Sequence, residues 1–463
     1  MKVLLVVYDN GSYISWFPQG LASIAAVLQR EGYEVEIYNQ DVHHYSEEHL
    51  TAYLDNNDFD VIGVSTIAGY YQYKKLLAIS RAIASSKNRP EHYIIGGHGP
   101  SPEPEYFLRK TEADIVVIGE GEETVVELLT VLADHDSLDD IKGIAYRDGS
   151  KVRVNERREL IQDIDSIPWP AYRLFPIEHY RLLRMPHATH SDFVLPMLSG
   201  RGCTFTCNFC YRMDKGFRPR SAEAIIEEIQ YLKKEYGINY IAFADELLMS
   251  SKQRTVEICE AFIKEKLNVK WDCNGRLNYA GPEILSVMKK AGCVFINYGI
   301  EAFDDEVLLK MNKALTTKQI EKGINATLAA GISPGLNMLF GHIGDSKESL
   351  QAAVDFLIKH DDGAQMRTIR PVTPYPGSPL YYHAIEQGLI ADIEDFYLNK
   401  HLNSDLFAVN FTELTEDELY CELTKANVAL LENYFTNKKK IMRSQTEELY
   451  TTRDASFRGF RQS

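Results

Sequence analysis

Three cysteines lie within eight positions of one another in this 463-residue chain. Cys203, Cys207 and Cys210 follow the spacing C-x3-C-x2-C. Three thiolates can hold three irons of a [4Fe-4S] cube and leave the fourth iron open to another ligand. A structural zinc ion needs a closed set of four ligands, and the nearest histidines are His187 and His190, upstream of the cluster. The spacing therefore favours an iron–sulfur cluster over zinc or inert buried thiols.

The elements before the cysteines alternate between short apolar runs and amphipathic helical patterns. This rhythm predicts a flavodoxin-like doubly wound parallel sheet, in which ligands bind at the carboxyl ends of the strands. The predicted strands cover residues 3–8, 34–39, 60–65, 92–96 and 114–118.

A second series of strands and helices begins just before the cysteines. Six predicted strands, the last at 365–373, are too few for a closed eight-stranded barrel and indicate a six-unit partial (β/α) barrel. Asp148-Gly149 predicts a hairpin turn in the segment between the two series. The expected parts are a doubly wound domain at 1–140, a connector at 141–190, the partial barrel at 191–385 and a helical C-terminal region at 386–463.

Composition places the chain among ordinary folded proteins, with 45% hydrophobic and 25% charged residues. A net charge of −16 disfavours a broad phosphate-binding surface, so we expect no nucleic-acid partner. No apolar run approaches the roughly 20 residues that span a bilayer, and the start lacks a signal-peptide pattern. We therefore expect no transmembrane segment and a cytoplasmic location.

The cysteine motif, with Phe209 as the aromatic residue of C-x3-C-x-aromatic-C, resembles the signature of the radical S-adenosylmethionine (radical SAM) superfamily. The resemblance implies that the open iron binds the amino and carboxylate groups of SAM. An electron from a donor such as flavodoxin or ferredoxin would then cleave SAM to a 5′-deoxyadenosyl radical, which takes hydrogen from unactivated carbon.

The same resemblance assigns roles to polar residues at later strand ends. It implies that Asp245 and Glu246 meet the SAM amino group, that Arg276 binds its carboxylate, and that Glu301 accepts the ribose hydroxyls. From the residues alone, Asp245 and Glu246 also suit a solvated helix N-terminus, and Arg276 also suits the protein surface.

A doubly wound domain ahead of a radical SAM core resembles the cobalamin-binding class of the superfamily, over roughly residues 1–385. That class includes the anaerobic magnesium-protoporphyrin monomethyl ester cyclase and many C-methyltransferases. Glycines at strand ends let the backbone approach a bulky cofactor, and a helix N-terminus can face its phosphate. The implied cobalamin contacts are Ser65, Thr66, Gly97, Gly119 and Gly121.

One departure concerns the metal of cobalamin. Carriers that donate a histidine to cobalt use D-x-H-x-x-G after the first strand, whereas this chain reads Asp9-Asn10-Gly11-Ser12-Tyr13 there. We therefore expect no histidine below the cobalt, so that Tyr70 or Tyr71 in the third-strand loop approaches it instead.

The resemblance implies a cobalamin-dependent radical SAM methyltransferase that methylates an unactivated carbon of a small-molecule, lipid, tetrapyrrole or peptide substrate. Three alternatives stay open: a cyclase or isomerase that uses SAM only as a radical source, an enzyme whose first domain has lost cobalamin, and a cobalamin or iron–sulfur sensor. A methylthiotransferase is disfavoured because it needs three further cysteines in its first domain, and none precedes Cys203. No catalytic side chain is identified.

We predict that replacing Cys203, Cys207 and Cys210 together by alanine abolishes both iron binding and SAM cleavage. The thiolates are the only cluster ligands that the motif supplies. Iron content and 5′-deoxyadenosine formation, measured after anaerobic reconstitution, check this outcome, and retained cleavage in the triple variant contradicts it.

Overall fold

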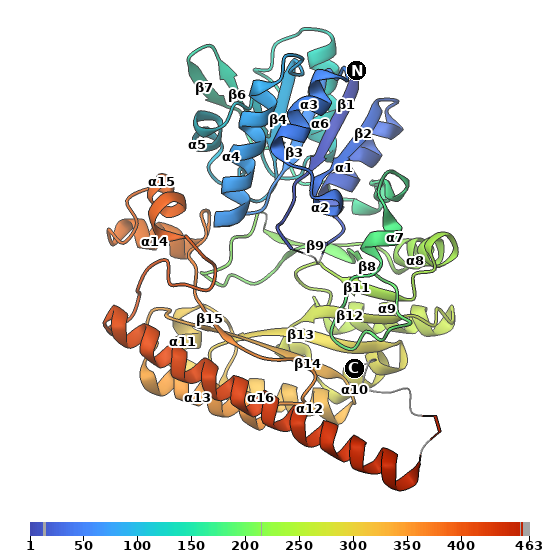
Figure 1. The fold of residues 1–463 in the computed structure, drawn as a ribbon, viewed down its shortest axis with the longest axis vertical. Helices are drawn as coiled ribbons and strands as arrows, with labels where there is room; N and C mark the ends of the chain where they lie inside the picture. Colours follow the sequence, from blue (N-terminus) through green and yellow to red (C-terminus); the bar gives the residue numbers. More distant parts are fainter. Residues whose placement is uncertain (13–14, 214, 454, 457–463) are drawn as a thin grey trace.

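The computed structural model describes residues 1–12, 15–213, 215–453 and 455–456. Tyr13, part of the predicted first-strand loop, and the last seven residues of the chain lie outside the described residues. Two α/β units are stacked in Figure 1, with the first unit above the second and the long C-terminal helix running beneath both.

The first unit confirms the flavodoxin-like prediction. Its five parallel strands have the order β2-β1-β3-β4-β5, and residues 3–7 of β1 are all buried because helices cover both faces of the sheet. The strands are β1 (Lys2–Val7), β2 (Glu34–Asn39), β3 (Val61–Ser65), β4 (His92–Gly96) and β5 (Ile115–Val117). The helices are α1 (Gln19–Arg30), α2 (Gln40–His43), α3 (Glu47–Asp55), α4 (Tyr70–Ser85), α5 (Pro104–Lys110) and α6 (Glu122–Ala133).

The predicted hairpin is present and belongs to the first sheet. Its strands are β6 (Ile144–Asp148) and β7 (Lys151–Val154), and Gly149 takes a positive φ of 59° in the turn between them. Because β6 pairs antiparallel with β5, the hairpin extends the sheet to seven strands. The first unit therefore continues past its parallel strands and includes this hairpin.

The second unit confirms the six-unit partial barrel. Its strands are all parallel, in the order β15-β14-β13-β12-β11-β8. The last strand is shorter than predicted, because only residues 369–371 pair with β14, and residues 365–368 line a cavity instead. The strands are β8 (Val194–Met197), β11 (Tyr240–Phe243), β12 (Lys270–Gly275), β13 (Cys293–Glu301), β14 (Ser333–Phe340) and β15 (Ile369–Pro371).

Helix α8 (Ala222–Tyr236) shows how the sequence sets these elements. Ser221 caps its first turn by accepting from the backbone of Ala224, and Gly237 ends it in the left-handed conformation. Ile225, Ile229 and Leu232 then bury one face of the helix against the barrel. The other barrel helices are α9 (Lys252–Lys264), α10 (Pro282–Lys290), α11 (Asp305–Lys310), α12 (Thr317–Ala329) and α13 (Lys347–Lys359).

The C-terminal region is helical, as predicted, and contacts both units. Tyr397 stacks on Tyr73 of α4 with ring centroids 4.4 Å apart, so this region shares the core of the first domain. Within the described ranges, no helix combines the length and apolar character needed to cross a membrane. The elements are α14 (Pro379–Glu386), α15 (Ile393–Asp395), a π-helical turn (Phe396–Lys400) and α16 (Glu416–Thr452), which packs on α13.

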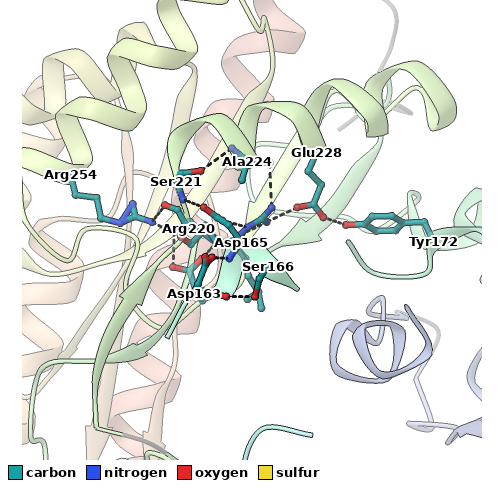
Figure 2. Close-up of polar contacts among 12 residues, drawn as sticks. Asp163, Asp165, Ser166, Tyr172, Arg220, Ser221, Ala224, Glu228 and Arg254 are labelled. Atoms are coloured by element: carbon teal, nitrogen blue, oxygen red, sulfur yellow. Dashed lines mark hydrogen bonds and ion pairs between the residues drawn. The ribbon is translucent and has the colours of Figure 1, made fainter. Parts of the chain in front are cut away.

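A buried polar cluster fastens the connector to the barrel (Figure 2). Glu228 of α8 is 1% exposed and accepts from the Tyr172 hydroxyl at 2.5 Å and from Arg220 Nη1 at 2.5 Å. Arg220 also donates to the backbone oxygen of Leu198 at 3.0 Å, directly after β8. Burial and the nearby Glu228 charge raise the pKa of Tyr172 well above its ordinary value, so its hydroxyl stays a donor. The cluster thus joins the connector to the end of the first barrel strand.

We predict that Glu228→Ala lowers the free energy of unfolding of the apoprotein by about 3–5 kcal/mol, because it removes the buried carboxylate that accepts from both Arg220 and Tyr172 and leaves Arg220 only the more exposed Asp165, at 3.6 Å, as a carboxylate partner. Urea denaturation followed by circular dichroism measures the change. Glu227→Ala, an exposed neighbour on the same helix, is the matched control and should shift the value by less than about 0.5 kcal/mol. Equal effects of the two substitutions would contradict a role for the cluster.

Candidate cluster and cofactor site

The cysteine loop is the connection of a short hairpin that the sequence did not reveal. Strand β9 (Gly200–Cys203) pairs antiparallel with β10 (Gly216–Pro219), and Cys203 is the last residue of β9. Gly202 takes a positive φ of 83°, and a Cβ there would collide with the backbone oxygen of Gly216. Glycine is therefore required next to Cys203 for the two strands to approach.

The three thiols lie close enough for their charges to influence one another. Cys207 is 5% exposed, and burial together with the negative charges of Cys207 and Glu301 raises the pKa of Cys210 to about 12. Burial also raises the pKa of Cys203, with Cys207 among the contributing charges. A ligand set for iron must therefore lose protons as the metal binds.

The donor set suits an iron–sulfur cube. Three thiols on one loop can each bind a different iron of a [4Fe-4S] cluster and leave the fourth iron open. His187, one of the zinc ligands considered from the sequence, packs instead against Phe295 near the amino end of β13.

Arg276 lies inside the site and not on the surface. It is 7% exposed, its Nη1 donates to Cys207 Sγ at 3.6 Å, and its guanidinium covers the ring of Phe205 at 3.5 Å. It also donates to the backbone oxygen of Lys313. Its positive charge also acts on Cys203, where it opposes the rise in pKa that burial causes.

Glu301 occupies a strained position at the end of β13. Its φ is +72°, and the pairing with β14 shifts register at this point. Its carboxylate accepts from Lys313 Nζ at 2.9 Å, and both residues are less than 9% exposed. Lys313 Nζ also lies 5.5 Å from the centroid of the Phe209 ring, which places this ion pair against the cysteine loop.

Asp245 and Glu246 have different environments. Asp245 is 3% exposed and accepts from the backbone N–H and the hydroxyl of Ser199 at 2.8 and 2.9 Å, while burial raises its pKa to about 6. Glu246 is exposed, and its charge contributes to the raised pKa of Cys203. Because the next helix starts only at Lys252, neither residue caps a helix, and the helix N-terminus interpretation is wrong.

A ladder of asparagines crosses the barrel, and sequence reasoning missed it. Asn337 donates to Asn297 at 3.1 Å, Asn297 donates to Asn274 at 3.0 Å, and Asn274 donates to the backbone oxygen of Asp245 at 3.0 Å. Each amide lies in a barrel strand, β14, β13 or β12, and in β14 and β13 its immediate neighbours are apolar or aromatic, which is the signal that could have found those two. The ladder presents polar groups beside the cysteine loop.

In the first domain, the loops after β3 and β4 touch. A Cβ on Gly97 would lie 2.5 Å from the Thr66 backbone oxygen and 2.7 Å from Ser65 Oγ, so these three predicted residues meet in one place. Two large apolar side chains, Trp16 and Ile67, stay 48% and 55% exposed in loops at the carboxyl ends of β1 and β3. This apolar edge, approached closely by backbone, fits a large flat cofactor such as a corrin ring.

The two tyrosines predicted near the cobalt have protein partners. The Tyr71 hydroxyl donates to the Asp9 backbone oxygen at 3.2 Å, and Tyr70 lies edge-on to the buried ring of His401, with centroids 5.9 Å apart. A closer approach of either ring to cobalt stays a prediction.

The remaining two glycines differ in their surroundings. Gly119 has a φ of +83°, and a Cβ there would meet only Arg157, at 3.7 Å, so space adjoins it. A Cβ on Gly121 would lie 2.8 Å from Ile24, which gives this glycine a packing reason at the crossing of α6 and α1. Their contacts to cobalamin stay predictions.

The carboxylates around Gly121 bind the cysteine hairpin. Glu120 accepts from Arg201 Nη1 at 2.8 Å and from Arg218 Nη1 at 2.7 Å, and Glu122 accepts from Arg201 Nη2 at 2.5 Å. Burial alone would raise the pKa of Glu120, but the two arginines outweigh it and lower the pKa. Two arginines of the second unit therefore bind the carboxylates at the start of α6.

Three loops meet between the two units. The ring of Tyr211, directly after Cys210, lies edge-on to His98 of the first domain, with centroids 6.0 Å apart. A Cβ on Gly377, in the loop after β15, would lie 2.5 Å from the Tyr211 ring and 2.9 Å from Pro102. The carboxyl edges of both sheets therefore face one another across the cysteine loop.

This fold and this loop define a radical SAM enzyme with an amino-terminal cobalamin domain, and comparisons with known proteins agree. The Radical SAM superfamily model matches residues 197–357, and the B12 binding domain model matches residues 10–129. The chain is 30% identical to an uncharacterized methyltransferase of Pyrococcus horikoshii over 401 residues, 84% of each chain. It is 26% identical to the anaerobic magnesium-protoporphyrin IX monomethyl ester cyclase of Rubrivivax gelatinosus, over 86% of this chain and 72% of the cyclase.

A solved structure with similar architecture is the radical S-adenosylmethionine methyltransferase TsrM from Kitasatospora setae, with cobalamin and a [4Fe-4S] cluster bound. Its TM-score is 0.69 at 18% identity, covering 83% of this chain and 75% of that one, which shows the shared fold. The chain belongs to the cobalamin-binding class of the radical SAM superfamily. The cofactors of that class are a [4Fe-4S] cluster, SAM and cobalamin.

We predict that Glu246, and not Asp245, meets the SAM amino group, because the Asp245 oxygens are already engaged by Ser199 whereas Glu246 is exposed beside Cys203. Glu246→Gln should weaken SAM binding by about tenfold, the effect of losing one charge-assisted hydrogen bond. Asp245→Asn, which keeps an acceptor for Ser199, is the control and should change binding by less than about threefold. Equilibrium binding of SAM to the reconstituted protein measures both. The reverse order of effects would assign the role to Asp245.

Proposed function

We propose that this protein is a methyltransferase that places a methyl group on an unactivated carbon of its substrate. When bound, the cluster with SAM supplies a hydrogen-abstracting radical, and cobalamin supplies the methyl group. Two features support the proposal: the carboxyl edges of the two sheets face one another, and the Pyrococcus horikoshii relative is named a methyltransferase.

The observation that carries this proposal is the contact of Tyr211 with both His98 and the Gly377 loop. Through this contact the cysteine loop lies directly against the loop after β4, at the carboxyl edge of the first sheet. A methyl group must wait within a few ångströms of the substrate radical, so the two cofactor sites have to open toward one space. A substrate between them meets both.

The chain's own residues position and shield this space. The Glu301–Lys313 pair supplies a fixed carboxylate for the ribose hydroxyls, and Arg276 supplies a buried cation beside Cys207. The loop carrying Gly377 and the C-terminal region, which packs on the first domain through Tyr397, limit access of water. An external flavodoxin or ferredoxin is the proposed electron donor, and the cytoplasm the proposed location.

The proposed division of the chain is a cobalamin domain at 1–140, a connector at 141–190, a radical SAM core at 191–385 and a helical region at 386–463; the two matched family models fall within the first and third of these parts. The proposed connector includes the hairpin that completes the first sheet. It also includes Tyr172, which fastens it to α8.

A cyclase is the second candidate, because the Rubrivivax gelatinosus relative carries that name and aligns with 86% of this chain. Such an enzyme would use SAM as a radical source without transferring its methyl group. The two candidates differ in whether the methyl group of SAM appears in the product: a methyltransferase transfers it, and a cyclase does not.

With methyl-labelled SAM, a chemical reductant and the substrate, we expect the label first on cobalamin and then on the product. Both 5′-deoxyadenosine and S-adenosylhomocysteine should form, because one SAM supplies the radical and another the methyl group. Mass spectrometry of product and corrinoid makes the measurement.

The triple cysteine variant is the control and should form no 5′-deoxyadenosine. If 5′-deoxyadenosine forms alone in the native protein and the product carries no label, the cyclase candidate replaces the methyltransferase.

A further inference from the structure

The C-terminal helix α16 carries an apolar stripe on its outer face. Its four buried residues all lie in the first half of the 37-residue helix and pack on the barrel: Leu419, Leu423, Ala426 and Leu430. On another face of the same helix, Val428, Phe435 and Met442 are 46%, 60% and 40% exposed. The helix therefore has a second apolar face, which is turned away from the barrel.

Asparagines fix the side of α16 that faces the barrel. Asn427 exchanges hydrogen bonds with the backbone of Ile369 in β15 at 2.8 and 3.0 Å. Asn433 and Asn437 donate to the Asp361 carboxylate at 2.8 and 3.4 Å. Beyond Asn437, the polar contacts of the described helix residues are internal to the helix, and its last turns extend past the barrel helices in Figure 1. These contacts set the rotation of the helix and keep the stripe pointing outward.

The end of α16, residues 438–452, lacks a packed face of its own. It contributes no buried residue, and its side chains of Ile441, Met442 and Tyr450 are 46%, 40% and 73% exposed. A helix of about 15 residues is marginal in water unless an apolar face packs on something. A partner on the stripe would supply the packing that this end of the helix lacks.

The stripe reads the same from both ends. Its members follow one another at seven-residue spacing: Cys421, Val428, Phe435, Met442 and Leu449. This spacing keeps side chains on the face of a helix that packs along another helix. Phe435 is the middle member and has two members on either side of it at equal distances. A two-fold symmetric interface requires such a pattern, because the same surface must fit itself after rotation.

The charges beside the stripe favour an antiparallel pair of helices. Residues 438–440 are three consecutive lysines. In a parallel pair in register, this run would lie against itself and repel. In an antiparallel pair centred on Phe435, Lys438 of one copy lies opposite Glu432 of the other, because each is three residues from the centre. Opposite charges beside an apolar seam stabilise such a pair and set its direction.

Two further charge effects agree with this arrangement. Glu422 would face Glu448 of the second copy, but it already pairs with Lys425 on its own helix at 2.8 Å. The whole chain carries −16, so net charge opposes contact between two copies through most faces. The lysine run makes α16 a locally basic face on an acidic protein.

We propose that two copies of this chain associate through α16, with the two helices antiparallel about a two-fold axis beside Phe435. The stripe of each copy then covers the stripe of the other, and the lysine run of one lies along Glu432 of the other. This inference does not depend on the proposed function, because the stripe lies outside the cofactor site.

Analytical ultracentrifugation of the full-length, cluster-reconstituted protein at micromolar concentration should give twice the mass of one chain. Phe435→Glu places two carboxylates at the symmetry axis and should reduce the mass to that of one chain. The matched control is Leu309→Glu on α11, which replaces an apolar side chain that is 81% exposed outside the stripe and should leave the doubled mass. A one-chain mass for the native protein, or a doubled mass for Phe435→Glu, overturns the inference.

The direction of the two helices is tested separately. Glu432→Lys and Lys438→Glu should each weaken dimerisation about tenfold, since each turns two attractive pairs into repulsive ones, and the double variant should restore it. With a short bismaleimide reagent, Leu449→Cys should cross-link to the exposed Cys421 of the second copy, whereas the native chain should not cross-link. Cross-linking of the native chain through Cys421 would show a parallel pair and overturn the proposed arrangement.

The same variants distinguish a second copy from a membrane. A one-chain mass, combined with sedimentation on phosphatidylglycerol vesicles that Phe435→Glu abolishes, would overturn the second copy and assign the stripe to an acidic membrane surface. Formation of 5′-deoxyadenosine by Phe435→Glu should equal that of the native protein, because the stripe faces away from the barrel. That equality shows that the variant has folded and that its change in mass comes from the stripe.

Discussion

The buried carboxylate of Glu120, bound by two arginines, is the constraint on which the site depends. Arg201 and Arg218 stand opposite one another in the β9–β10 hairpin, and both donate to Glu120 of the first domain. Loss of the Glu120 carboxylate, or of both arginines, would leave a buried charge without a partner, which costs several kcal/mol. Because Cys203 ends β9, this interaction fixes the start of the cysteine loop relative to the first domain.

The remaining contacts between the units support the same placement. Glu228 holds Tyr172 of the connector and Arg220 after β10, while Tyr397 of the C-terminal region stacks on α4 of the first domain. The site is thus enclosed by segments from every part of the chain. A reaction through a carbon radical needs this enclosure, since its groups must be close and water must be excluded.

Charged side chains inside the second unit lie in two places. Arg276 and the Lys313–Glu301 pair are buried against the cysteine loop. Arg367 lies just before β15 and pairs with Asp362 at 2.8 Å, while Arg370 of β15 lies 3.7 Å from the exposed Asp405. The charges beside the cysteine loop are therefore buried, and part of those near β15 is exposed.

The sequence by itself determined the cluster motif and both sheet architectures, because these follow from local spacing: three thiols share one loop, and alternating strands and helices allow few parallel topologies. It could not decide between the site and two alternatives that the structure excludes: a helix N-terminus for Asp245 and Glu246, and the protein surface for Arg276. It also missed Lys313 and the asparagine ladder. The ladder depends on partners distant in the chain, since Asn274 lies 29 positions after Asp245 and 23 before Asn297. Only the tertiary structure decides which buried charges meet, since burial and pairing are set by packing and not by neighbours in sequence.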